Sequence, residues 1–308
     1  MGPLEDAALL RPENGPPLAF TVDFITPIVD DPEDFGAIAA ANALSDVYAM
    51  GGDPQVALAV CGFPEELVSR ETLARIFRGG RDKAAEAGCA IVGGHTVLDP
   101  ELKYGLCVIG TAPSDHSLSH TGGAAGDRLV ITKPLGFGIA AQAIKHQRLD
   151  AASLERVVEA MKTLNRGAKD AALEAGARAA TDVTGFGLLG HLRHLAQGAG
   201  CAARLWAGEV PRYDFALELA RAGRVPGGSK ANLAYVASST RFEEAIAEEE
   251  RLLLADAQTS GGLLIAIAAG REDELVRELA SRGTPAHAVV GELAEGEAGR
   301  IEVSAERR

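Results

Sequence analysis

Four aspartates stand beside the expected ends of strands, turns or helices, with no basic residue accompanying them locally. They are Asp6, Asp23, Asp46 and Asp182. Mg²⁺ in proteins is typically bound by one or two carboxylates together with substrate phosphates and water. If these carboxylates converge from their distant segments, they would suit a site for a magnesium–nucleotide complex.

Asn42 and Asp46 are four residues apart in a helix predicted over residues 33–50. They therefore share one face of a helix that is otherwise rich in Ala, Ile, Leu and Val. Asp46 falls in the last turn, where the helix dipole disfavours a negative charge. A compensating cation would explain its place, and a solvated surface aspartate is the simpler alternative for this helix taken alone.

The segment TDVTGFGLLGHL (181–192) places Asp182 at the end of a strand-like stretch, before a glycine turn and a helix. Glycine allows the backbone to approach a phosphate closely, and a carboxylate at a strand end is a common metal ligand. His191 and His194 lie three residues apart and could suggest a metal pair. Because no third ligand stands at a matching spacing, we favour a solvated or hydrogen-bonded role for both.

Two further segments, VGGHT (92–96) and DAQTSGG (256–262), bring together small and hydroxyl-bearing residues. Such segments can donate backbone N–H groups to phosphate oxygens or form a tight turn. Neither has the GxxxxGK[ST] spacing, which excludes a Walker-type site, and GFGIA (136–140) lacks the full GxGxxG pattern. His95 could be a base, and a turn residue is the favoured interpretation.

The elements that must position these residues alternate between strand-like and helical patterns. Asp31 and Pro32 predict the start of the helix over 33–50, and Ser69 predicts the cap of a second helix that runs to Ala87. Residues 18–29, 55–61, CAIVGG, YGLCVIGTA, LVITK, 263–268, 287–291 and 300–303 are predicted strands. Four or five helical stretches are predicted after LVITK, and turn formers over 112–127 mark a boundary. The prediction is an α+β protein with domains 1–112 and 113–308.

The composition of the 308 residues is that of a globular protein, with 47% hydrophobic and 24% charged residues. A formal net charge of -13 disfavours nucleic acid as a partner. No apolar run reaches the roughly 18–20 residues that span a bilayer, and the first residues do not resemble a secretory signal. The cysteines form no CxxC pair and lie mostly in apolar stretches, which predicts reduced thiols and a cytoplasmic protein.

Several motifs together give the chain a strong resemblance to a known family. They are TVDFITPIVDDPEDFGAIAAANALSDVYAMGG (21–52), VGGHTVLDPELKYGL (92–106), ITKPLGFG (131–138), DVTGFGLLGHL (182–192) and DAQTSGGLL (256–264). In this order they resemble selenophosphate synthetase (selenide, water dikinase). The glycine motifs are shared in part with aminoimidazole ribonucleotide synthetase, thiamine-phosphate kinase and the hydrogenase-maturation dehydratase.

The resemblance implies a two-domain aminoimidazole ribonucleotide synthetase-like (PurM-like) fold, paired into a homodimer through the N-terminal domains. It implies that ATP, selenide and water give selenophosphate, AMP and orthophosphate, with Mg²⁺ as cofactor and ATP partly covered by the partner subunit. The implied metal ligands are Asp6, Asp46 and Asp182. The implied nucleotide-contacting residues are Pro3, Leu4, Glu5, Asp23, Asp46 (through the metal), Gly94, His95 and Thr96.

The family also carries, upstream of the region of Asp6, a glycine-rich arm with a Cys or selenocysteine followed by a lysine. The printed sequence has no Cys before Cys61 and no Lys before Lys83, so the resemblance assigns it no catalytic residue. A real internal start or a deliberately shortened chain is one explanation. We hypothesise instead that the gene encodes selenocysteine there by an in-frame UGA that was read as a stop. Absence of an in-frame UGA and a nearby Lys codon upstream of Met1 would contradict this hypothesis.

Two other functions stay open on the sequence. One is another kinase of the superfamily, which would release ADP rather than AMP. The other is an ATP-binding homologue without catalysis, which nucleotide would stabilise without turnover.

Overall fold

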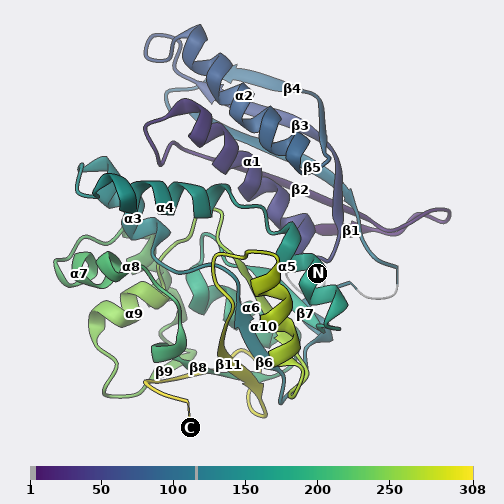
Figure 1. Cartoon of the computed structure of the whole chain (residues 1–308), viewed down its shortest axis with the longest axis vertical. Helices are drawn as coiled ribbons and strands as arrows, with labels where there is room; N and C mark the ends of the chain where they lie inside the picture. Colours follow the sequence, from purple (N-terminus) through teal and green to yellow (C-terminus); the bar gives the residue numbers. More distant parts are fainter. Residues whose placement is uncertain (1–4, 115–116, 308) are drawn as a thin grey trace.

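The computed structural model describes residues 5–114 and 117–307, and these residues form two β-sheets with helices packed on them (Figure 1). The first sheet has the order β1-β2-β5-β3-β4. Its strands are β1 (Ala8–Leu10), β2 (Leu18–Ile25), β3 (Asp53–Phe63), β4 (Ala90–Leu98) and β5 (Lys103–Thr111). The second sheet has the order β7-β10-β6-β11-β8-β12-β9. Its strands are β6 (Arg128–Ile131), β7 (Ala179–Asp182), β8 (Ala202–Trp206), β9 (Thr240–Phe242), β10 (Leu263–Ile267), β11 (Ala288–Ala294) and β12 (Ile301–Ser304).

Two helices, α1 (Pro32–Ala49) and α2 (Arg70–Glu86), lie side by side against the first sheet in Figure 1. Asp31 accepts hydrogen bonds from the first free N–H groups of α1, and Ser69 does the same for α2. The predicted starts of both helices are therefore confirmed. Local capping fixes these boundaries, which is why the sequence alone could place them.

The helices of the second half are more numerous than predicted. Seven α-helices lie between Phe137 and Leu254 in the part of the chain that the structure describes, so the prediction of four or five was wrong. They are α3 (Phe137–Lys145), α4 (Ala151–Lys162), α5 (Arg166–Glu174), α6 (Gly187–Gly198), α7 (Asp214–Arg221), α8 (Gly227–Val236) and α9 (Glu248–Leu254). Helix α10 (Glu272–Ser281) follows β10. Most are short, and short helices separated by a few residues merge in a sequence pattern.

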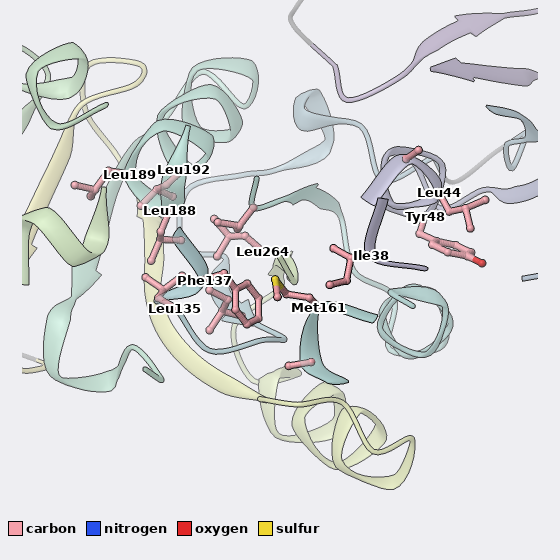
Figure 2. Packing of buried hydrophobic residues seen from close by; sticks show 14 of the residues in the cluster. Ile38, Leu44, Tyr48, Leu135, Phe137, Met161, Leu188, Leu189, Leu192 and Leu264 are labelled. Carbon is pink, nitrogen blue, oxygen red and sulfur yellow. The ribbon is translucent and has the colours of Figure 1, made fainter. Parts of the chain in front are cut away.

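Helix α1 is buried over almost its whole length because both halves of the chain pack on it. Its residues Ile38 and Leu44 belong to the same buried cluster as Leu135, Phe137 and Leu264 of the second half (Figure 2). An amphipathic helix would expose one face. Helix α1 instead forms part of the core of both halves, and its polar residues lie at the junction between them.

The opposite face of the first sheet exposes apolar side chains. Val22 and Leu58 both pair in register with Cys107, so they lie in one row on one face. Val22, Phe24 and Leu58 are between 43% and 55% exposed, and Val92 is 64% exposed. A cluster of large apolar side chains on one face is typical of a contact surface.

Among the described residues, no helix combines the length and the apolarity that crossing a membrane requires.

Candidate functional site

A cavity of about 740 Å³ lies at the junction of the two halves, and the four aspartates singled out in the sequence all line it. Asp23 comes from β2, Asp46 from α1, Asp182 from the end of β7, and Asp6 from the residues before β1. No lysine or arginine occurs among the described residues that line this cavity. The structure therefore brings the carboxylates together without a described lysine or arginine to neutralise them, and histidines such as His120 beside Asp6 are the basic side chains of the lining.

Asp23 and Asp46 are held by neighbouring polar side chains. The side chain of Asn42 donates from Nδ2 to Asp23 Oδ2 over 2.8 Å, and the Thr21 hydroxyl donates to Asp46. Burial, followed by the negative charges of Asp182 and Asp23, raises the pKa of Asp46 well above its ordinary value. Since only 9% of Asp46 is exposed, the interpretation of this residue as a solvated surface aspartate is wrong.

Asp6 is fixed from the second half of the chain. Its Oδ1 accepts a hydrogen bond of 2.9 Å from the Thr181 hydroxyl, and its Oδ2 lies 3.3 Å from His120 Nε2. The ring of His191 continues this arrangement, because Nδ1 lies 3.4 Å from the Thr181 hydroxyl and Nε2 accepts from the Thr184 N–H at 3.1 Å. Acceptance at Nε2 leaves the proton on Nδ1 of the neutral ring. Thr181 can then accept from His191 and donate to Asp6.

Burial lowers the pKa of His191 to about 4, so the ring is neutral at pH 7. The predicted hydrogen-bonded role of His191 agrees with these contacts. His194 is also hydrogen-bonded, with Nε2 3.3 Å from the Tyr235 hydroxyl. The sequence had shown no third ligand for this histidine pair, but the fold places ligand atoms of Asp6, Asp182 and His191 within 4.8 Å of one another.

Asp182 is the most deeply buried of the four aspartates, with 1% of its surface exposed. Burial and the charge of Asp6 raise its pKa well above the ordinary value, and an interaction with Ser45 opposes the shift. Its Oδ2 is buried and has no hydrogen-bond partner among the described residues. A buried carboxylate oxygen without a donor is costly unless a cation binds it. The residues present therefore fit a divalent cation, whose preferred ligands are such oxygens.

The remaining sequence-predicted site residues divide into three groups. Glu5 lines the cavity and accepts hydrogen bonds from Ser119 and the His120 N–H. Pro3 and Leu4 lie outside the described residues.

Gly94, His95 and Thr96 line a separate cavity of about 570 Å³ beneath α2. The interpretation of His95 as a turn residue is wrong, since VGGHT lies within β4. Gly94 is required there because a Cβ would lie 2.1 Å from the Ala59 carbonyl oxygen.

Two parts of the cavity wall were not predicted. Phe186, His194 and Tyr235 form an aromatic cluster beside the acidic residues. The second part is His120, which lies beside Oδ2 of Asp6, whereas Thr181 donates to Oδ1. Phe186 and His194 lie close together in the sequence, whereas Tyr235 comes from a distant segment. Their sequence signals were the glycine turn that carries Phe186 and the pair of His191 and His194.

The fold and the site define the class of the protein. The family described as "AIR synthase related protein, N-terminal domain" matches residues 4–112, and "AIR synthase related protein, C-terminal domain" matches residues 124–304. Two solved structures share the fold over 99% of this chain. One is thiamine-monophosphate kinase from Stenotrophomonas maltophilia, at 23% identity and TM-score 0.72, covering 90% of that chain. The other is the hydrogenase maturation protein HypE in complex with ATP, at 22% identity and TM-score 0.71, covering 87% of that chain.

The sequence relatives are more specific. Selenide, water dikinase of Pelobacter propionicus is 46% identical over 97% of this chain and 86% of the relative. Selenide, water dikinase of Carboxydothermus hydrogenoformans is 45% identical over the same shares of the two chains. The chain belongs to the selenide, water dikinase (selenophosphate synthetase) family, as the resemblance implied.

Proposed function

We propose that this chain makes selenophosphate from ATP, selenide and water, with AMP and orthophosphate as the other products, and so supplies activated selenium. The family membership supports this activity. The observation that carries the site is the convergence of four carboxylates on one cavity that no described lysine or arginine lines. Such a cavity repels a bare triphosphate and accepts it only together with cations.

We assign Mg²⁺ to Asp6, Asp46 and Asp182. Three observations support this assignment: the unpartnered Asp182 Oδ2, the raised pKa values of Asp46 and Asp182, and the grouping of Asp6 with Asp182. Bound magnesium would neutralise phosphate charge, which is the main requirement of phosphoryl transfer. The chain's own contribution is positioning. Thr181 orients Asp6, and Thr21 orients Asp46.

We assign nucleotide contacts to Pro3, Leu4, Glu5 and Asp23 at the cavity, to Asp46 through the metal, and to the segment Gly94–Thr96. In the sheet order, β5 and β3 separate β4 from β2. At about 4.8 Å per strand, Gly94–Thr96 therefore lies roughly 14 Å from the strand that carries Asp23. This distance suits a nucleotide that extends along the first sheet, or a second copy that brings its own β4 near the cavity.

We propose that the chain forms a homodimer through the exposed apolar face of the first sheet. Val22, Leu58 and Val92 supply the apolar surface, and an exposed edge strand such as β4 is normally covered in a native assembly. This arrangement would cover part of the nucleotide with the partner.

We also propose a cytoplasmic location and two domains, 1–112 and 113–308. The four cysteines are free thiols, as expected in a reducing compartment. The domain boundary is supported by the end of β5 at Thr111 and the start of the next strand at Arg128.

The test is ³¹P NMR of the chain incubated with MgATP and selenide under anaerobic, reducing conditions, with Asp182→Asn as a control. We expect selenophosphate, AMP and orthophosphate from the wild-type chain and none from the variant. Release of ADP would instead support another kinase of the superfamily. Unchanged ATP, together with thermal stabilisation by a non-hydrolysable ATP analogue, would support a non-catalytic homologue if both persist after the family's arm with its Cys or selenocysteine and Lys is joined to the chain.

A further inference from the structure

The loop Gln258–Gly262 carries a serine in an unusual backbone conformation. Ser260 has φ of 52°, in the left-handed region that non-glycine residues rarely adopt. Such a conformation is energetically unfavourable and persists only where the surroundings hold it. An explanation for Ser260 must therefore come from the contacts around it.

Three elements hold the three polar groups of Ser260. Its N–H donates to Asn42 Oδ1 of α1 over 2.8 Å, and its hydroxyl donates to the Met161 carbonyl of α4 over 2.6 Å. Its carbonyl accepts a hydrogen bond of 2.9 Å from Lys133 Nζ. The loop conformation is thus determined by bonds to α1, α4 and the segment after β6.

Lys133 is unusual as the donor of one of these bonds. It is 1% exposed, and its Nζ also donates to the Thr163 carbonyl over 2.7 Å. Burial lowers the pKa of Lys133 to about 7, with the charge of Asp182 opposing the shift. Burying a lysine among carbonyl oxygens costs free energy. Lys133 does not line the acidic cavity, so the cavity does not explain its burial. Its contacts tie together the end of α4 and the loop.

The loop in turn reaches the acidic cavity through Asn42. This side chain accepts from Ser260 and donates to Asp23 Oδ2 over 2.8 Å. An amide side chain that accepts at one end and donates at the other fixes its own orientation. A shift of Ser260 would therefore rotate or displace Asn42 and change the position of the Asp23 carboxylate.

A second side chain couples the same loop to α1. Asn165 Nδ2 donates to the Gly261 carbonyl over 2.9 Å and to the Ser45 hydroxyl over 2.8 Å. No side chain would fit at this point of the loop, because a Cβ on Gly261 would lie 1.9 Å from the Val183 carbonyl oxygen. The loop is therefore packed between α1, which carries Asp46, and the residue that follows Asp182.

We propose that Lys133 is a positioning residue that acts through Ser260 and Asn42 to hold the Asp23 carboxylate in the nucleotide cavity. The inference rests on the proposed nucleotide role of Asp23. Lys133 touches neither the cavity nor any of the four aspartates in the described contacts, so beyond its charge interaction with Asp182 its effect travels along a series of hydrogen bonds. The hydrogen bond from Lys133 to Ser260 and the one from Asn42 to Asp23 act in series. Breaking either bond should therefore release the same Asp23 carboxylate.

The experiment uses the full chain as wild type, Lys133→Met, Asn42→Ala and the double variant. The affinity for the non-hydrolysable analogue AMPPCP with Mg²⁺ is measured by isothermal titration calorimetry, and KM for ATP and kcat are measured separately. We expect each single variant to weaken AMPPCP binding about tenfold, with a matching rise in KM for ATP and a smaller change in kcat. We expect the double variant to bind no more weakly than either single variant.

The matched control is Lys169→Met. Lys169 is also a buried lysine, and it forms an ion pair of 2.9 Å with Asp53 of the first half, but it does not line the cavity. We expect this variant to lose stability while it binds AMPPCP within twofold of wild type.

The outcomes separate the inference from the proposed function. Failure of the wild-type chain to bind AMPPCP would overturn the nucleotide site and the inference with it. Binding by wild type together with unchanged affinity of Lys133→Met, or a hundredfold loss in the double variant, would overturn the inference alone. If Lys133→Met does not fold, Asn42→Ala serves as the test, because alanine suits the alanine-rich helix α1. Wild-type affinity of Asn42→Ala for AMPPCP would then overturn the proposal.

Discussion

The negative charge of Asp182 contributes to the raised pKa of Asp46, although the two residues lie in different halves of the chain. In the sequence, 135 residues separate them. Burial is the larger cause of the shift, and the Asp182 charge is the next. The pair therefore stores electrostatic repulsion that a divalent cation would relieve. This relationship links stability, metal binding and activity in the predictions that follow.

Replacing Asp182 by Asn should stabilise the metal-free protein while it abolishes selenophosphate synthesis. The substitution removes a buried carboxyl that must either carry an unpaired charge or take up a proton on folding, and we expect a gain of about 1–2 kcal/mol in the free energy of unfolding at pH 7. Urea unfolding in EDTA measures this gain. The control is Asp127→Asn, because both oxygens of the buried Asp127 accept hydrogen bonds, from the Ala124 N–H and from the half-exposed Arg178, and losing one of these acceptors should destabilise the protein. A loss of stability in Asp182→Asn would contradict the prediction.

Magnesium affinity should increase with pH. The folded-state pKa values of Asp46 and Asp182 are raised, chiefly by burial, so these carboxyls retain protons that the cation must displace. The free energy of unfolding of the metal-free protein should therefore fall as the pH rises from the unfolded-state pKa of these carboxyls through their raised folded-state pKa values. Calorimetric titration with Mg²⁺ in two buffers of different ionisation enthalpy measures the protons released. Binding without net proton release at pH 6 would contradict this prediction.

Disruption of the exposed face of the first sheet should produce monomers. We expect Leu58→Glu to shift the chain from dimer to monomer, because a charge would then lie in the centre of the apolar row. Light scattering coupled to size-exclusion chromatography measures the mass. The matched control is Leu154→Glu on α4, where the exposed leucine lies outside this face. A wild-type chain that is already monomeric at micromolar concentration would reject the proposed interface.

Asp256 should contribute more to stability than an ordinary helix cap. Helix α3 has no cap from its own Gly136, and Asp256 Oδ2 accepts from the N–H groups of Gly138 and Ile139 at 3.0 and 3.1 Å. Asp256→Ala would leave these donors buried without a partner, for which we expect a loss of about 2–3 kcal/mol. The exposed cap of α4, Asp150, provides the comparison, with about 1 kcal/mol or less expected for its replacement by Ala. Equal losses measured by urea unfolding would contradict the argument.

The sequence was informative where the determining interactions are local. Asp31 and Ser69 cap their helices within three residues, and the strand patterns of β3 and β10 lie close to the predicted ranges. The strands β1, β8 and β9 were missed, because three, five and three residues are too few to show a clear alternation.

The candidate site was predictable in residue type but not in arrangement. Its four aspartates were chosen for their places beside strand, turn and helix ends, but nothing local predicted that Thr181 would orient Asp6 or that Lys133 would hold Ser260. These bonds join residues more than a hundred positions apart. Burial of Asp46 was likewise invisible, since it depends on the second half of the chain packing against α1.

The burial of α1 also limits how substrates can enter. Its side chains Ile38 and Leu44 are fully buried in a cluster shared by both halves, and exposing one such side chain costs about 1.5–3 kcal/mol. Rotating the two halves away from each other would expose many of these buried side chains at once. We therefore expect ATP and selenide to enter past the rim of the cavity, where Phe186 and Tyr235 are about half exposed, without opening of the junction itself.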